Sequence, residues 1–398
     1  MKLSAIIVSY NVRYYLAQCI DSLKKAGSDI DMEIIVVDNA SSDGTKDFIQ
    51  QMFPNDWGNK LKFIPNNKNV GFGQANNQAL KLATGEFILY VNPDTLVAEN
   101  TLMDCLSFYA GHPEAGAVGV RMLHPNGLFA LESRRGNPAP LTSLWKVLGL
   151  TRRFPQSKTF GKYYLQYLND KEICKVDIVS GAFMMVPHEL LNQTGAFDED
   201  FFMYGEDIDL SYRIKQSGKQ NYYIPARILH YKGESTNKTS RRYVNIFYEA
   251  MVIFFKKHYS KINLLYLPIH FAIYFLALTA LFKQSVKKLA AKTHSARNEK
   301  LIYHFYVGPQ SVETAKQLNQ AFHLNGEITI CQQQSHSVPF ESGSDNKKCY
   351  YFNIYDMDLF SISKILNTFD DAKKKNCFIG TFYSRQKTFI THEQAYHL

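Results

Sequence analysis

Carboxylates directly follow two short apolar runs in the first hundred residues of the chain. Asp38 closes the run at residues 34–37, and Asp94 follows the run at residues 87–91. Short apolar runs rich in β-branched and aromatic residues are typical of buried strands. Open α/β sheets bind their ligands beyond the carboxyl ends of parallel strands. The two carboxylates therefore indicate a nucleotide and metal site at one edge of such a sheet.

Each carboxylate has a defined chemical use at that edge. Asp38 can accept a hydrogen bond from a base N–H such as N3 of uracil or thymine, and backbone groups near Ser9 can frame the same ring. We expect the chain at Asn69 and Gly71 to lie beside the base and the ribose. Asp94 can hold Mg²⁺ or Mn²⁺, which would neutralise two phosphates of a leaving group. Taken singly, these residues are equally typical of turns.

An acidic pair and a histidine could act on the reacting sugar. Glu206 and Asp207 follow the aromatic-rich stretch at residues 201–204. A carboxylate in an aromatic pocket can take the proton from an attacking hydroxyl, and we expect Asp207 to be this base, with Glu206 second. The helix dipole alone also favours acidic residues at a helix start. His230 could complete the metal site of Asp94, although a lone histidine is more often structural.

The elements that must position these residues alternate along the chain. We expect strands at residues 3–9, 33–37, 61–64, 87–91 and 117–122, with helices between the first four, and ordered structure again at 177–186. A long basic excursion covers residues 124–175, a helix begins at residue 205, and short strands cover 222–224 and 228–230. Alternation at this spacing predicts βαβ units, an α/β fold and a mostly parallel sheet.

The length of 398 residues predicts more than one folding unit. We expect a catalytic domain at 1–258, a hydrophobic, basic-flanked segment at 259–298, and a small α/β module of unknown role at 299–398. Residues 264–282 lack Asp, Glu, Lys and Arg. As a helix they would span ~28 Å, close to the ~30 Å hydrocarbon core of a bilayer. Lysines on both sides favour a helix lying in the bilayer face, with a single membrane pass and a buried core helix left open.

The net charge of the chain and the motifs it contains argue against several classes of function. The net charge of +9 favours acidic partners, and without a nucleic-acid motif we expect lipids and phosphates rather than nucleic acid. Six cysteines without a CxxC pair indicate free thiols in a reducing compartment. No GxGxxG follows the first strand, which argues against a dehydrogenase. The first apolar run is too short for a signal peptide, so we expect the catalytic domain in the cytosol.

Seven short blocks, in order along residues 1 to about 258, resemble the family 2 glycosyltransferases. The resemblance is to the rhamnosyltransferase-like branch of bacterial surface polysaccharide synthesis, and it is specific because the blocks keep the order of the family. They are AIIVSYN at 5–11, VVDNASSDG at 36–44, NVGFGQANN at 69–77, YVNPD at 90–94, VSGA at 179–182, FFMYGEDIDL at 201–210 and LHY at 229–231.

This resemblance implies a GT-A fold, a nucleotide-diphospho-sugar donor such as a dTDP-rhamnose-like or UDP-sugar, a divalent metal (Mg²⁺ or Mn²⁺) and inversion at the anomeric carbon. It implies that Asp38 binds the base, that Asp94 ends a DxD-like metal motif whose first position is Asn92, and that His230 can join the metal. It implies that Asp207 belongs to the acidic pair that supplies the base. The remaining residues expected around the donor are Ser9, Tyr10, Asn69, Gly71 and Asn76.

We expect the acceptor to be a growing, lipid-linked saccharide. Arg134, Arg135 and residues 152–153 could hold its diphosphate, or could simply form a solvated basic surface, and we also assign Ser180 and Gly181 to the acceptor. The expected location is the cytoplasmic face of the bacterial inner membrane, as a peripheral or monotopic protein. Two alternatives stay open, a non-catalytic membrane-bound nucleotide-sugar-binding protein and a nucleotidyltransferase. A homo-oligomer is also left open.

Overall fold

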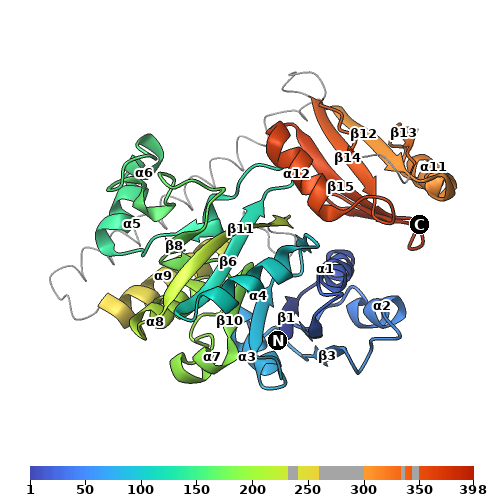
Figure 1. Cartoon of the computed structure of the whole chain (residues 1–398). Helices are drawn as coiled ribbons and strands as arrows, with labels where there is room; N and C mark the ends of the chain where they lie inside the picture. The colour runs from blue at the N-terminus through green and yellow to red at the C-terminus, as the bar shows by residue number, and fades with distance from the viewer. Residues whose placement is uncertain (232–240, 260–299, 333–336, 343–348) are drawn as a thin grey trace.

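The computed structural model describes residues 1–231, 241–259, 300–332, 337–342 and 349–398 (Figure 1). Residues 1–259, called here the N-terminal unit, are built on a nine-stranded sheet. Helices α1, α2 and α4 pack on one face of this sheet, and α3, α7 and α8 pack on the other. The central strands are therefore covered on both faces, which is why they read as continuous apolar runs in the sequence.

The first half of the sheet is parallel, with strand order β3-β2-β1-β4. Its elements are β1 (Lys2–Ser9), α1 (Arg13–Ala26), β2 (Asp31–Asp38), α2 (Thr45–Met52), β3 (Leu61–Pro65), α3 (Phe72–Leu80) and β4 (Phe87–Val91). The predicted α/β fold and these four strands are confirmed. All four strands point their carboxyl ends to the same edge.

The second half of the sheet is mixed. Strand β10 (Phe183–Pro187) runs antiparallel to β4 and to β6 (Ala115–Leu123). Strand β11 (Gln220–His230) is parallel to β6 and antiparallel to β5 (Thr95–Val97) and β8 (Cys174–Val176). The two short strands expected within residues 222–230 are thus one strand, because a register shift between Ile224 and Arg227 bends it without ending it. The remaining helices are α4 (Thr101–Gly111), α7 (His188–Thr194), α8 (Glu206–Gln216) and α9 (Arg241–Tyr259).

The basic stretch at residues 124–175 is built from short elements. These are η1 (Leu131–Ser133), β7 (Arg134–Arg135), α5 (Pro140–Val147), α6 (Leu150–Arg153) and η2 (Gly161–Tyr163). Strand β7 pairs antiparallel with β9 (Ile178–Val179). Residues 134–135 of the excursion are therefore tied to the strand that precedes β10, and its last residues pair with β11 through β8.

Residues 300–398, called here the C-terminal unit, form a six-stranded sheet with strand order β13-β12-β14-β15-β16-β17. Its elements are β12 (Lys300–Val307), η3 (Pro309–Ser311), α11 (Val312–Ala321), β13 (Glu327–Ile330), β14 (Cys349–Asp356), α12 (Ile362–Ala372), β15 (Cys377–Tyr383), β16 (Thr388–Ile390) and β17 (Ala395–His397). The sequence predicts strands here at residues 302–307, 327–330, 350–354 and 377–382, and these ranges fall within β12, β13, β14 and β15.

The C-terminal unit docks on the N-terminal unit through α12. Arg121 of β6 donates to Asp370 at 2.6 Å, and both side chains are only 2% exposed. Glu99 accepts from the backbone N–H groups of Ile362 and Ser363 at the start of α12. One hydrophobic cluster contains residues of both units. The two units therefore share a core.

The segment at residues 264–282, expected to contact the membrane, lies outside the described residues. Within the part of the chain that the structure describes, no helix is both long enough and apolar enough to cross a bilayer.

Candidate active site

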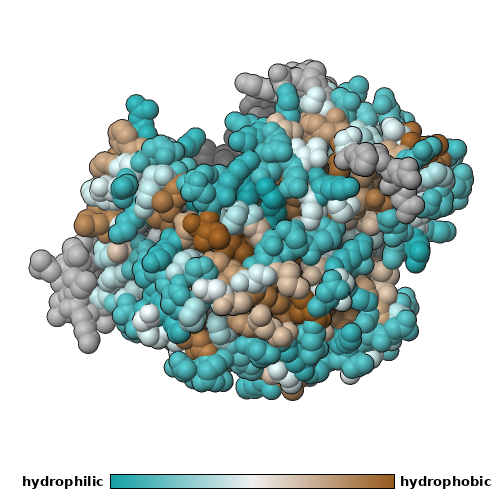
Figure 2. Space-filling model, in the orientation of Figure 1, coloured by the Kyte–Doolittle hydropathy of each residue, from teal (hydrophilic) through white to brown (hydrophobic). Residues whose placement is uncertain are grey.

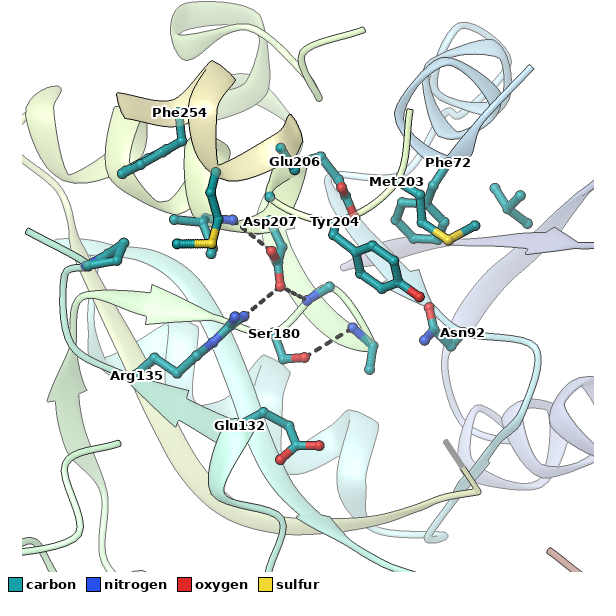
Figure 3. A pocket seen from close by; sticks show the side chains of 18 of the residues that line it. Phe72, Asn92, Glu132, Arg135, Ser180, Met203, Tyr204, Glu206, Asp207 and Phe254 are labelled. Atoms are coloured by element: carbon teal, nitrogen blue, oxygen red, sulfur yellow. Dashed lines mark hydrogen bonds and ion pairs between the residues drawn. The ribbon is translucent and has the colours of Figure 1, made fainter. Parts of the chain in front are cut away.

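A pocket of about 570 Å³ brings together segments that are far apart in the sequence. Its wall includes Asp94 from the turn after β4, Gly181 from the turn after β9, Asp207 from the start of α8 and His230 from the end of β11. The predicted base and the predicted metal ligands therefore lie in one pocket. Figure 3 shows part of this wall.

Sheet register explains why Asp94 and His230 meet. Strand β5 pairs antiparallel with β11 so that Thr95 lies opposite His230, which brings the preceding Asp94 to the end of β11. Asp94 Oδ1 lies 3.3 Å from His230 Nε2, and Asn92 Nδ2 lies 3.2 Å from the same nitrogen. All three residues line the pocket.

The donor set at Asp94 and His230 is small. No group of three or more His, Cys, Asp or Glu side chains that could hold a metal occurs among the described residues. Mg²⁺ typically keeps several waters and takes one or two carboxylates together with substrate phosphates. One carboxylate and one imidazole facing an open pocket therefore fit a cation whose other ligands are phosphate and water.

The carboxylate of Asp207 is held in place by three donors. Its Oδ2 accepts from Arg135 Nη2 at 2.6 Å and from the Gly181 backbone N–H at 3.0 Å, and its Oδ1 accepts from the Ile208 N–H at 2.8 Å (Figure 3). A Cβ at position 181 would lie 3.2 Å from Asp207 Cβ, so glycine permits this close approach. Arg135 pairs with Ile178 in the β7–β9 ladder, so strand pairing fixes the backbone position from which the guanidinium extends.

Glu206 lines the same pocket but differs from Asp207 in its protonation and its contacts. The side chain is buried, and its Oε2 has no hydrogen-bond partner among the residues that the structure describes. Burial in the first place, and the negative charge of Asp207 in the second, raise the pKa of Glu206 to about 8. At neutral pH the two neighbouring acids therefore differ, since Glu206 carries a proton and Asp207 is ion-paired with Arg135.

A strained turn leads into the acidic pair. Tyr204 has a φ of +68° and Gly205 a φ of +89°, so two successive residues occupy the left-handed region directly before α8. A Cβ on Gly205 would also meet the Phe201 ring at 2.9 Å. The turn carries Tyr204 into the pocket wall (Figure 3). Strained backbone of this kind clusters at functional sites.

The expected donor residues divide into those that line the pocket and those behind it. Asp38 is buried behind the wall and accepts from the Ser41 backbone N–H at 3.0 Å. Burial raises the pKa of Asp38 above its ordinary value, and the bonds from Ser41 oppose this. Its neighbour Asn39, which the sequence argument missed, does line the pocket and donates to the Gly71 carbonyl. Of the donor residues expected from the sequence, Tyr10, Asn69, Asn92 and Asp94 line the pocket, whereas Ser9, Asp38, Gly71 and Asn76 do not.

The arginines assigned to the acceptor lie in different places. Arg135, Ser180 and Gly181 line the pocket, but Arg134 does not. Arg134 is buried, donates to the carbonyls of Asn169 and Leu168, and packs against two aromatic rings. This placement corrects the expectation that Arg134 binds the acceptor. Successive strand residues point to opposite faces, so β7 cannot present both arginines to one pocket. Residues 152–153 of α6 are exposed and lie outside the pocket wall.

The apolar side of the pocket was not expected from the sequence. It is formed largely by α9, through Tyr248, Met251, Phe254 and Phe255. The spacing of these residues, i, i+3, i+6 and i+7, is a helical stripe that could have revealed it. Lys146 of α5 lies on the same wall, with its ammonium 3.6 Å from the centre of the Tyr163 ring.

Comparison with known proteins gives consistent similarities. Residues 4–195 match the model of Glycosyl transferase family 2. N-acetylglucosaminyl-diphospho-decaprenol L-rhamnosyltransferase of Mycobacterium tuberculosis is 26% identical over 270 residues, 65% of this chain and 85% of that protein. Rhamnosyltransferase WbbL of Escherichia coli is 27% identical over 242 residues, 57% of this chain and 82% of that protein.

Solved structures show more distant similarity. The mannosyltransferase PcManGT from Pyrobaculum calidifontis, solved with GDP-Man and Mn²⁺, is 20% identical, with a TM-score of 0.44 and 80% of each chain covered. Staphylococcus aureus TarS is 22% identical, with a TM-score of 0.42, 64% of this chain and 39% of that chain covered.

Proposed function

Because the chain carries a glycosyl transferase family 2 domain over residues 4–195, and the protein is therefore a glycosyltransferase, we propose that it moves a sugar from a nucleotide-diphosphate donor to a lipid-linked saccharide with inversion at the anomeric carbon. The observation that carries this proposal is the convergence of Asp94, His230 and Asp207 on one pocket. The relatives named for rhamnose transfer, one of them onto a decaprenol-linked sugar, favour a dTDP-rhamnose-like donor and a polyprenyl acceptor.

The proposed reaction uses Asp207 as the general base. Its carboxylate takes the proton of the acceptor hydroxyl, the oxygen forms a bond to C1 of the donor sugar, and the bond between C1 and the nucleotide diphosphate breaks on the opposite face. The three donors to Asp207 aim the carboxylate and leave its position unchanged during the reaction. Correct placement of this kind is a substantial part of catalysis.

Glu206 complements this role by remaining neutral. A pKa near 8 keeps a second negative charge out of a pocket that must accept a diphosphate. Ionised, the side chain would oppose donor binding and would compete with Asp207 for the acceptor proton. Glu206 is therefore the second candidate base only at alkaline pH.

Asp94 and His230 would hold a divalent cation, Mg²⁺ or Mn²⁺, and Asn92 lies against the histidine. Such a cation would supply charge neutralisation for the departing diphosphate. The residues of this chain contribute the site itself, since β5 and β11 fix the spacing of the two ligands.

The remaining parts of the proposal concern the nucleotide and the location. Asp38 accepts from Ser41 and does not line the pocket, whereas Tyr10, Asn39 and Asn69 do, so we assign these three residues to the nucleotide. We place the enzyme at the cytoplasmic face of the bacterial inner membrane, where polyprenyl-linked acceptors are accessible.

A direct assay tests the function. The full chain is incubated with dTDP-rhamnose or a UDP-sugar and an N-acetylglucosaminyl-diphospho-polyprenol. The mass of the product lipid is then measured by mass spectrometry. The expected result is an acceptor heavier by one sugar, with release of the nucleotide diphosphate. Pyrophosphate released from a nucleoside triphosphate and a sugar phosphate would instead show a nucleotidyltransferase. Donor binding without turnover for every acceptor would favour a binding protein.

A further inference from the structure

Helix α5 presents an exposed row of leucines. Leu141, Leu144 and Leu148 are 63%, 39% and 59% exposed, and their spacing of i, i+3 and i+7 places them on one side of the helix. Phe154, directly after α6, is also exposed. Figure 2 shows hydrophobic surface interspersed with hydrophilic surface over α5 and α6. These two helices lie at the end of the molecule away from the C-terminal unit (Figure 1).

The segment that carries this row is uniformly basic. Residues 133–169 contain seven arginines and lysines and no aspartate or glutamate. Arg134, Arg135 and Lys146 are engaged by carbonyls, a carboxylate and an aromatic ring. The other four cations are Arg152, Arg153, Lys158 and Lys162, which are all exposed. Within the described ranges of the chain, none of these four forms an ion pair. Exposed leucines beside unpaired cations complement a surface that is apolar inside and anionic outside.

The leucine row lies on a helix that also lines the active-site pocket. Ser143 and Lys146 of the same helix line that pocket, as do aromatic residues of α9. One side of α5 therefore faces the reaction, and another side carries the exposed leucines. A lipid layer against this row would therefore lie beside a helix that forms part of the pocket wall.

We propose that Leu141, Leu144, Leu148 and Phe154 insert into the interfacial layer of an anionic lipid bilayer while the four exposed cations contact lipid phosphates. Interfacial helices bind by buried apolar area together with attraction to anionic lipid. This inference deepens the proposed function by naming the surface that faces the lipid. Its test measures binding to vesicles and does not depend on sugar transfer. Either proposal can therefore fail without the other.

Vesicle flotation with the full chain tests the surface. The probe is a phosphatidylcholine vesicle with or without phosphatidylglycerol, and the variant is Leu141→Gln/Leu144→Gln/Leu148→Gln. The matched control is Leu82→Gln/Met103→Gln, which changes exposed apolar residues elsewhere on the N-terminal unit. We expect wild type and control to float with the anionic vesicles and the triple variant to bind about tenfold more weakly, a modest share of the full transfer energy of three leucines.

Tryptophan fluorescence separates α5 from any other membrane contact. The chain has two tryptophans, so Trp57→Phe leaves only Trp145, which lies on α5. We expect its emission to shift to the blue on anionic vesicles and to be quenched by lipids brominated in the acyl chain.

Three results would overturn the proposal. The first is a vesicle-bound protein whose Trp145 is neither shifted nor quenched, which would place the attachment elsewhere, for example at residues 264–282. The second is equal binding by the triple variant and wild type, or no binding by either. The third is a dimer without vesicles that the triple variant abolishes, which would assign the row to a second copy of the chain.

Discussion

The guanidinium of Arg135 lies 2.6 Å from the carboxylate of Asp207, and the two residues are 72 positions apart in the sequence. Both side chains are largely buried in the pocket wall. The ion pair ties the basic segment at residues 124–175 to the start of α8. The proposed base is thereby held by a residue from the segment that also carries α5, so that the acceptor side and the catalytic side of the pocket form one rigid arrangement.

Replacement of Asp207 by asparagine should abolish transfer and leave donor binding nearly unchanged. The amide keeps the shape of the side chain but cannot accept the proton, so we expect kcat to fall by about 10²-fold or more. Steady-state kinetics and calorimetry with the donor separate the two effects. The control is Asp371→Asn, an exposed carboxylate on the C-terminal unit. Unchanged turnover in Asp207→Asn would remove this residue from the mechanism.

Replacement of Arg135 by methionine should lower kcat because the carboxylate loses the partner that aims it. We expect a loss of about tenfold or more, since small displacements of catalytic groups are costly. Arg135→Lys, which keeps the charge, should recover part of the rate. If Arg135 instead binds the diphosphate of the acceptor, the KM for the acceptor will rise while kcat is retained.

The ionisation of Glu206 should make the fold less stable as the pH rises. The pKa is about 8 in the folded protein and 4.5 ordinarily, so between these values the folded state holds a proton that the unfolded state has released. Stability from this group is full below about pH 4.5 and is lost progressively up to about pH 8. Glu206→Gln cannot ionise, so urea unfolding at pH 5, 6.5 and 8 should show a smaller decline than wild type. Parallel curves for the two proteins would contradict the raised pKa.

Removal of divalent cations should silence transfer. EDTA is expected to abolish product formation, and Mg²⁺ or Mn²⁺ should restore it, because the pocket offers Asp94 and His230 as ligands. His230→Gln should raise the cation concentration needed for half-maximal rate by about tenfold or more, through the loss of one of two protein ligands. Titration of each cation into the stripped enzyme gives this value. Full activity in EDTA would indicate a reaction without a metal.

Breaking the ion pair between the two units should destabilise the protein strongly. Arg121→Met leaves Asp370 buried with Arg227, at 3.4 Å, as its cationic partner among the described residues, and it also takes a partner from Asp170. We therefore expect a loss of about 3 kcal/mol in the free energy of unfolding. Arg121→Met/Asp370→Leu removes both charges and should recover most of that loss. The exposed pair Lys171–Asp371 is the control, and its disruption should change little. Urea unfolding measures all of these variants.

The strands of the first half of the fold were predictable because each is a local apolar run buried on both faces. The start of α8 was predictable too, since Gly205 and the acidic residues after it are helix-start signals. Strand β11 was divided in two in the prediction because Pro225 and the residues around it interrupt the apolar pattern, and only pairing with β6 shows that the strand continues.

The carboxylates of the site could be predicted from the sequence, but the residues that contact them and their protonation could not. Motif order identified Asp94, Asp207 and His230, which the structure places in one pocket. The choice between Arg134 and Arg135 depends on the strand face that each residue occupies, and the two-residue strand β7 carries no periodicity from which to read it. The proton on Glu206 depends on burial, which is a property of the assembled fold.

The contact between Arg121 and Asp370 also has a consequence for how this chain can evolve and be shortened. Arg121 of the N-terminal unit pairs both with Asp170 of its own unit and with a carboxylate 249 positions later, so truncation before α12 would remove one of its two carboxylate partners. A fragment ending near residue 259 should therefore keep the Arg121–Asp170 pair but expose part of the apolar cluster that the two units share. Relatives that keep the C-terminal unit should accordingly keep Arg121 and Asp370 together.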